Sequence, residues 1–294
     1  MPFAAASRRL ALAAILLAAA GSAGRADSAA ESRGAYLAAA AGCDQCHTDS
    51  AHGGQPYAGG RRLATAFGTI PTPNITPDAA TGIGDWSVAD FARALRWGVA
   101  PDDSHYVPAF PFPFYQRLGD RDLADLKAFL DSLPAVSTPR AVGADSKALL
   151  ARAGAAMAIA LEPPHGKWRP DTTRDAVWNR GGYLVATVGR CGDCHTPRDL
   201  AGRPIPDRFL AGNASNAGGK KAPNITPDRE TGIGKWSEDE IIALLKDGQT
   251  PEVDFVGGAM AEIVRNTTRL TDADRWAIAV YLLSIPAKSF PPKN

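Results

Sequence analysis

The chain has 294 residues, of which 45% are hydrophobic and 21% charged, a composition that is ordinary for a globular protein and a length that suffices for two domains. Its 32 lysines and arginines nearly balance its 31 aspartates and glutamates, so no net charge draws it to nucleic acid or to an anionic membrane surface. The 29 glycines and 23 prolines predict short helices joined by long loops.

The N-terminus is typical of a secretory signal peptide. Arg8 and Arg9 precede an apolar run over residues 10–20, and small residues follow as far as Ala26. The run is too short to span a membrane, and no later stretch reaches 18 apolar residues. We therefore expect residues 1–26 to be cleaved and the mature protein to be periplasmic, without a membrane span, either free or peripheral on the membrane.

Two short segments share the pattern Cys-x-x-Cys-His, at residues 43–47 and 191–195. Cysteines three positions apart lie on one face of a helical turn, so both sulfurs can bond the vinyl groups of one haem, and the next histidine can bind its iron. A zinc site or a thiol redox pair does not explain why histidine follows the second cysteine both times. The pattern predicts two covalently bound haem c groups, held by Cys43, Cys46, His47, Cys191, Cys194 and His195.

The segments downstream of these motifs are also duplicated. Pro-Asn-Ile-Thr-Pro-Asp at residues 73–78 recurs at 223–228, and Thr-Gly-Ile-Gly-x-Trp-Ser at 81–87 recurs at 231–237, both at a spacing of 150 residues (224 − 74). Such identity at a constant spacing indicates an internal repeat. We predict one domain over residues 27–138, a linker over 139–175 and a second domain over 176–294.

Each repeat contains helix signals in the same order. Ser87 with Asp90, and Ser237 with Glu240, match the capping box, and these helices are expected to end at Gly98 and Gly248. A second helix is predicted from Asp120 to Leu133 and from Asp272 to Ile285, each ending before a proline. Apolar residues at helical spacing on these helices are expected in the core; they are Leu123, Leu126, Phe129 and Leu130, and Trp276, Ala279, Tyr281 and Leu282. The predicted fold is all-α.

The linker has no counterpart in the repeat. Prolines bracket an alanine-rich stretch over residues 144–161, which we predict to be one helix packed across the interface between the domains. This arrangement would hold the domains together, while a flexible tether is the alternative.

The sixth iron ligand is expected to differ between the two haems. Met260, on a glycine-rich loop 65 residues after His195 (260 − 195), is the candidate for the second haem. The spacing of 150 residues places Phe110 at the matching position, and phenylalanine cannot bind iron. For the first haem we consider His105 first and Met157 second, or an open sixth position. Unequal ligands would give the two haems unequal potentials.

The duplicated loops suggest support for the haems. The carbonyl oxygens of Pro73 and Pro223 could accept the free N–H of each proximal histidine, and the indoles of Trp86 and Trp236 could reach haem propionates. Simple loop packing is the alternative.

The order of these motifs resembles that of the cytochrome c subunits of membrane-associated alcohol, gluconate and fructose dehydrogenases. The resemblance rests on Cys-x-x-Cys-His, Pro-Asn-Ile-Thr-Pro-Asp and Thr-Gly-Ile-Gly-x-Trp-Ser, followed by Pro-Ala-Phe-Pro-Phe or Gly-Gly-Ala-Met. It implies two tandem class I cytochrome c domains, all-α. The alcohol dehydrogenase type has three haem motifs where this chain has two, and its Pro-Ala-Met-Pro methionine is Phe110 here.

The resemblance implies an electron-transfer subunit rather than a catalyst. A periplasmic or membrane-associated dehydrogenase would be the donor, and quinone, an oxidase or another cytochrome the acceptor. The alternative is a dihaem oxidoreductase of the peroxidase or thiosulfate-oxidising type, with catalysis at an open first haem. Rapid cyanide binding or peroxide turnover would favour the enzyme.

Overall fold

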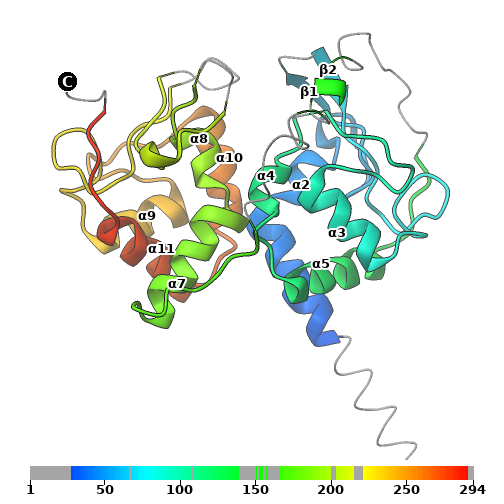
Figure 1. Cartoon of the computed structure of the whole chain (residues 1–294), viewed down its shortest axis with the longest axis horizontal. Coiled ribbons are helices and arrows are strands. Elements are labelled where there is room, and N and C mark those ends of the chain that lie inside the picture. The colour runs from blue at the N-terminus through cyan, green and yellow to red at the C-terminus, as the bar shows by residue number, and fades with distance from the viewer. Residues whose placement is uncertain are drawn as a thin grey trace, which may run out of the picture.

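The computed structural model describes residues 28–65, 68–107, 109–138, 150, 152–154, 157, 166–199, 203–214 and 221–290. The predicted signal peptide lies outside these residues. The described part is mostly helical and forms two halves that lie side by side, the N-terminal half in blue to green and the C-terminal half in green to red (Figure 1). The linker joins them, so each half is continuous in sequence.

The N-terminal half contains both helices predicted at residues 87–98 and 120–133, together with a pair of strands that was not expected. A helix over residues 28–41 comes first. The elements after it are α2 (Cys43–Cys46), η1 (Ser50–His52), β1 (Arg62–Thr65), β2 (Gly68–Pro71), α3 (Val88–Trp97), α4 (Phe112–Tyr115) and α5 (Asp120–Ser132).

The C-terminal half repeats this order around its own cysteine motif. Its elements are α7 (Ala176–Tyr183), the π-helical η2 (Leu184–Val188), α8 (Cys191–His195), η3 (Pro206–Arg208), α9 (Glu238–Asp247), α10 (Gly258–Thr267) and α11 (Asp272–Ser284). The helix α10 corresponds to the short α4 of the N-terminal half.

The capping boxes form as predicted. The Ser87 hydroxyl accepts the Asp90 N–H at 3.1 Å, and the Asp90 carboxylate accepts the Ser87 N–H at 3.0 Å. Ser237 and Glu240 make the same two bonds at 3.2 and 2.7 Å. These bonds satisfy amide groups that have no partner inside the helix and so fix where α3 and α9 begin.

The prediction of an all-α fold was wrong in one detail. β1 and β2 form an antiparallel hairpin whose register runs from Arg62 opposite Pro71 to Thr65 opposite Gly68. In the described part of the corresponding loop of the C-terminal half, a single bridge joins Asn213 to Ala222. The strands have four residues each and lack an alternating apolar face, so the sequence carried little strand signal.

The first and last helices of each half cross at a glycine. A Cβ atom on Gly34 would overlap the carbonyl oxygen of Asp125 in α5, and one on Gly181 would overlap that of Ala277 in α11. Only glycine allows the two backbones to approach this closely. The crossing places each cysteine motif, which follows the first helix, at a fixed position relative to the last helix.

The apolar stripes of the last helices lie in the core, with one exception. Leu123, Leu126 and Leu130 are buried in α5, as are Ala279, Tyr281 and Leu282 in α11, while Phe129 packs against them at the margin. Trp276 is 43% exposed, so its predicted core position was wrong. Its indole N–H instead donates to Glu238 Oε2 at 2.7 Å, which explains why it can lie at the surface.

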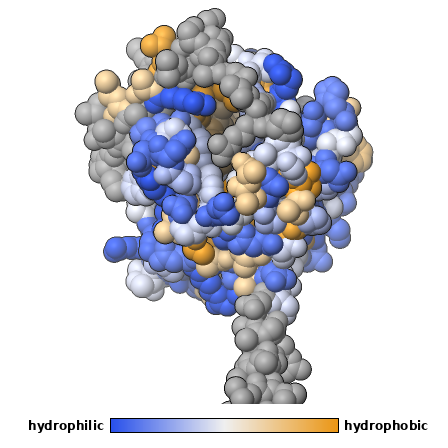
Figure 2. Space-filling view, turned by 90° about the vertical axis from the view of Figure 1, so that its right-hand side faces the viewer, coloured by the Kyte–Doolittle hydropathy of each residue, from blue (hydrophilic) through white to orange (hydrophobic). Residues whose placement is uncertain are grey.

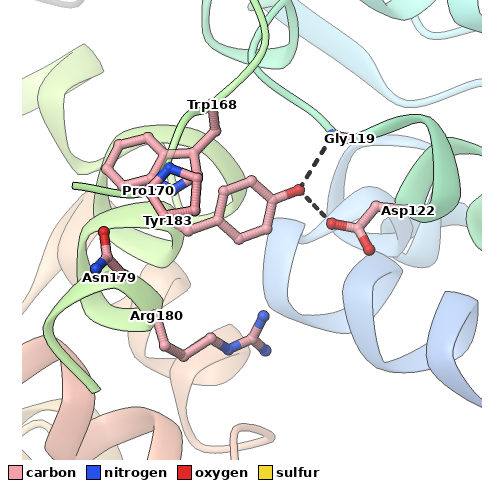
Figure 3. A pocket seen from close by; sticks show the side chains of 7 residues that line it. All are labelled: Gly119, Asp122, Trp168, Pro170, Asn179, Arg180 and Tyr183. Carbon is pink, nitrogen blue, oxygen red and sulfur yellow. Dashed lines mark hydrogen bonds between the residues drawn. The ribbon is translucent and has the colours of Figure 1, made fainter. Parts of the chain in front are cut away.

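Two reciprocal tyrosines join the halves. The Tyr36 hydroxyl, from the first helix, donates to Asp274 Oδ2 of α11 at 2.6 Å and accepts the Thr271 N–H at 3.0 Å. At the matching positions, the Tyr183 hydroxyl of α7 donates to the Asp122 carboxylate of α5, and the Gly119 N–H lies 3.5 Å from it. Figure 3 shows the Tyr183 side chain reaching across to Asp122 of α5. Both residues line a pocket of about 340 Å³.

The end of the linker packs against both halves. The Trp168 N–H donates to the Arg117 carbonyl at 2.9 Å, and the Trp168 indole lies 6.1 Å from the Tyr183 ring. These contacts agree with domains that are held together. Leu150, residues 152–154 and Met157 are helical as predicted, but they are exposed, so in the described residues this helix does not pack across the interface.

Hydrophilic side chains predominate on the face of the N-terminal half that Figure 2 shows, with hydrophobic ones in small separate groups. Within the residues that the structure describes, no helix has the length and apolar character needed to cross a membrane.

Candidate functional site

Each cysteine pair lies on a short helix that begins after a left-handed residue. Gly42 (φ 70°) precedes α2, and Arg190 (φ 53°) precedes α8. The left-handed turn separates the cysteine helix from the helix before it and gives the short helix its own direction. None of the four cysteines, Cys43, Cys46, Cys191 and Cys194, all of which the structure describes, is in a disulfide bond.

Both histidines that follow the cysteines make the same hydrogen bond. His47 Nδ1 lies 2.8 Å from the Pro73 carbonyl oxygen, and His195 Nδ1 lies 2.8 Å from the Pro223 carbonyl oxygen. A carbonyl oxygen only accepts, so Nδ1 carries the proton and donates it, and Nε2 keeps its lone pair. The predicted role of the two proline carbonyls is confirmed.

The protonation state of these histidines suits an iron ligand. Burial lowers the pKa of His47 and of His195, and the bonds to Pro73 and Pro223 oppose that shift only in part. The imidazoles are therefore neutral at pH 7, and Nε2 is free to bind a metal.

An asparagine network holds Pro73 in place. The Asn74 amide donates to the Val136 carbonyl at 2.7 Å and to Thr81 Oγ1 at 3.0 Å, and its oxygen accepts the N–H and the hydroxyl of Thr76 at 2.9 and 2.8 Å. The Asp78 carboxylate accepts from Thr81 at 2.7 Å. The loop that carries the proline carbonyl is thus fastened to the segment after α5.

The second loop is fastened in the same way. Asn224 donates to the Lys288 carbonyl at 2.5 Å and to Thr231 Oγ1 at 3.0 Å, and accepts from Thr226 at 2.9 and 2.8 Å. The Asn-Ile-Thr-Pro-Asp repeats therefore fix the histidine acceptor. Trp86 and Trp236 are both half-buried. The predicted hydrogen bonds from their indoles to haem propionates stay a prediction.

The donor set fits covalently attached haem. Burial raises the pKa of Cys43 to about 12 and that of Cys191 to about 11, so these thiols stay protonated at neutral pH and are poor nucleophiles for disulfide exchange. Among the described residues no three His, Cys, Asp or Glu side chains gather as a metal-binding group. Two thiols beside one neutral imidazole suit haem c.

The two halves differ where a sixth ligand is expected. The prediction that Met260 lies on a glycine-rich loop was wrong: it lies half-buried in the first turn of the helix α10. The matching Phe110 packs against aromatic rings, 5.7 Å from Tyr106 and 5.8 Å from Tyr115. Ligation by Met260 stays a prediction.

The candidate sixth ligands of the first haem, His105 and Met157, also have defined positions, but no contact that the structure describes joins either of them to His47. His105 bridges Val99 at the base of a loop, and its Nδ1 is buried with no hydrogen-bond partner in the described part of the chain, a polar atom that still needs a partner. Met157 is 66% exposed. His52 is exposed and bonds Asp49 at 2.9 Å. His165 lies outside the described residues.

Contacts that were not predicted from the sequence join the segment around each cysteine pair to the opposite half. Gln45 of α2 donates to the Glu262 carbonyl of α10 at 2.8 Å, and Asp44 pairs with Arg269 at 2.8 Å. Arg190, directly before α8, reaches the Ala41 carbonyl of the first helix. The only sequence signal was a departure from the repeat, since arginine stands at position 190 where the first copy has Gly42.

Comparison with known proteins extends this picture. The family described as cytochrome c matches residues 31–134. The chain is 41% identical to a dihaem c-type cytochrome of Cereibacter sphaeroides over 87% of this chain and 86% of that protein. It is 38% identical to the fructose dehydrogenase cytochrome subunit of Gluconobacter japonicus and to the gluconate 2-dehydrogenase cytochrome c subunit of Pantoea cypripedii. The chain spans only 53% and 59% of the length of those two subunits.

Proposed function

This chain belongs to the dihaem c-type cytochromes, and we propose that it carries electrons from a periplasmic or membrane-associated dehydrogenase toward quinone, a terminal oxidase or another cytochrome. Support comes from its likeness to cytochrome subunits of fructose and gluconate dehydrogenases. Export to the periplasm, through cleavage of residues 1–26, is part of the proposal.

The observation that carries the proposal is the duplicated histidine geometry. Both His47 and His195 present Nε2 while a proline carbonyl holds Nδ1 at the same 2.8 Å. A chain that uses one of its motifs for another purpose would have no reason to keep this bond in both. We therefore assign two haem c groups, one to each half.

Bound haem supplies a one-electron couple at its iron, and the residues of the chain provide its setting. The Nδ1–H bonds fix the imidazole orientation and raise ligand basicity. The networks around Asn74 and Asn224 keep the proline carbonyls in place, so that little rearrangement accompanies a change of charge. The bond from Gln45 of α2 to Glu262 of α10, and the contact of Arg190 with the Ala41 carbonyl, place both attachment segments next to the opposite half.

The test is a haem count followed by an electron count. Protein made in a host that attaches c-type haem is expected to exceed the mass of the chain without residues 1–26 by two haems, and to take up two electrons per chain. The Cys43→Ser, Cys46→Ser variant and the matched Cys191→Ser, Cys194→Ser variant should each lose one haem. A wild-type protein without covalently bound haem would refute the proposal.

Phe110 favours a second candidate function. Because its ring is packed between tyrosines and cannot bind iron, the first haem could have an open sixth position and act on a small molecule such as peroxide. Turnover of hydrogen peroxide with a reduced electron donor, or rapid cyanide binding, would support this enzyme. Inertness to both would support the carrier.

A further inference from the structure

Arg190 occupies a backbone position that suits glycine. It directly precedes Cys191 with φ 53° and ψ 36°, and the matching residue of the other half, Gly42, has φ 70° and ψ 34°. Glycine adopts this left-handed conformation without steric cost, and arginine does not. A side chain on Gly42 would collide with Asn266 of α10. The interface therefore has room for a long side chain at one of the two matched positions only.

The Arg190 guanidinium lies among groups of the opposite half. Its central carbon is 5.5 Å from the centre of the Tyr115 ring, and Nη2 is 3.5 Å from the Ala41 carbonyl. Both contacts belong to the N-terminal half, and Ala41 is two residues before Cys43. The backbone of Arg190 thus lies beside one cysteine motif, and its guanidinium lies near the other.

The charge of Arg190 is only weakly compensated. The side chain is 19% exposed, and its Nε is buried with no hydrogen-bond partner among the residues the structure describes. Asp193 lies 3.8 Å away, but it is also paired with Arg198 at 2.5 Å. A buried charge shared in this way acts at longer range than an exposed one, because water does not screen it.

We propose that Arg190 places one positive charge between the two haem attachment segments and so raises the reduction potential of both haems. The inference rests on the proposed function. Oxidation adds one positive charge at an iron, and a fixed positive charge nearby opposes that change. Arg190 is thus a positioning residue for electron transfer.

The test is a redox titration of the two-haem protein. In Arg190→Gln the midpoints of both haems should fall. Taken over the two haems together, the ferrous-to-ferric ratio at a fixed potential should fall by about tenfold, which is 59 mV for a one-electron couple. Arg190→Lys should keep midpoints near those of the wild type. Arg180→Gln is the matched control: Arg180 is also an interface arginine, paired with Asp274 at 2.7 Å, and its loss should leave both midpoints in place.

Arg190→Gly separates charge from structure. It removes the charge while restoring the residue of the matched position, so the midpoints should fall as in Arg190→Gln while thermal stability is kept or raised. Midpoints that stay unchanged in both variants, or that fall equally in Arg180→Gln, would overturn the inference. A wild-type protein with fewer than two haems would instead refute the proposed function, and the haem count distinguishes the two failures.

Discussion

The two halves of the chain agree around the histidine of each cysteine motif and differ where a sixth ligand is expected. The bond from the histidine to the proline carbonyl and the bonds of the asparagine network have lengths that agree to within 0.2 Å between the halves. At the expected position of the sixth ligand, Met260 on the long helix α10 is matched by Phe110 before the short α4. The histidine setting is therefore duplicated, while the candidate sixth ligand has diverged.

The largest expected effect concerns Met260. If it binds the second iron, Met260→Ala should lower one midpoint by about 0.1 V or more, within the roughly 0.8 V range that axial ligands span. The sulfur-to-iron charge-transfer absorption band should disappear, while the other midpoint stays in place. Redox titration followed by absorbance checks both. A retained band would show that Met260 is not the ligand.

His105 offers the corresponding test in the first half, with a matched control. His105→Ala should open the first haem, so cyanide should bind on the order of tenfold faster because no ligand has to leave first. Phe255 has the matching position in the second half, where it bridges Gln249 as His105 bridges Val99, and it is 64% exposed. Phe255→Ala should leave cyanide binding unchanged. Equal rates in His105→Ala and wild type would exclude His105 as a ligand.

The asparagine networks should be equally important in both halves. Asn74→Ala and Asn224→Ala each remove four hydrogen bonds of a buried side chain and should lower the free energy of unfolding by about 2 to 4 kcal/mol. Urea unfolding of the haem-bound protein measures this. A loss in only one variant would mean that the two loops do different work in spite of their common sequence.

The smallest effect is expected at the reciprocal tyrosines. Tyr36→Phe and Tyr183→Phe should each cost about 1 to 2 kcal/mol, since each removes a bond to a carboxylate, and the two losses should add. Unfolding of both single variants and of the double variant in urea gives these values. A double variant that loses clearly less than the sum would show that the two contacts depend on each other.

The Tyr36 contact should also depend on pH. Although burial opposes it, bonds from Arg180 and Tyr36 lower the pKa of Asp274 below its ordinary value of 3.8. The carboxylate thus stabilises the fold fully above that value, and the contribution is lost as the pH falls from 3.8 through the lowered pKa. Tyr36→Phe should lose less stability than wild type over this acid range, as thermal unfolding measured from pH 5 down to pH 2 would show.

Local signals in the sequence predicted most of each half. Three features depend only on neighbouring residues: the capping boxes, the glycines that end α3 and α9, and the last helices. Because each of these signals occurs in both copies of the repeat, the sequence identifies them. The hairpin β1–β2 was missed because its strands are short. The exposure of Trp276 was missed because helical spacing does not show that Glu238 offers its indole a polar partner.

The contacts at the interface between the halves could not be predicted from the repeat. Bonds such as Tyr36 to Asp274 and Gln45 to Glu262 join residues more than 200 positions apart, and nothing in their own neighbourhoods marks them. Arg190 was visible only as a difference from Gly42, and its meaning depends on Tyr115 and Ala41 of the other half. The sixth ligands could be ranked from spacing but not assigned, because loops and not helices carry Phe110 and His105.

The reciprocal tyrosine contacts have an evolutionary consequence. Tyr36 meets Asp274 as Tyr183 meets Asp122, which is the self-complementary pattern of a two-fold homodimer. A precursor of half this length would already have carried both sides of the junction on its own surface, and fusing two copies required no new contact. In a homodimer, however, both copies must keep the same residue at every position. Two copies fused in one chain are free of this constraint, so arginine can stand where the matched position has glycine, and phenylalanine where the matched position has methionine.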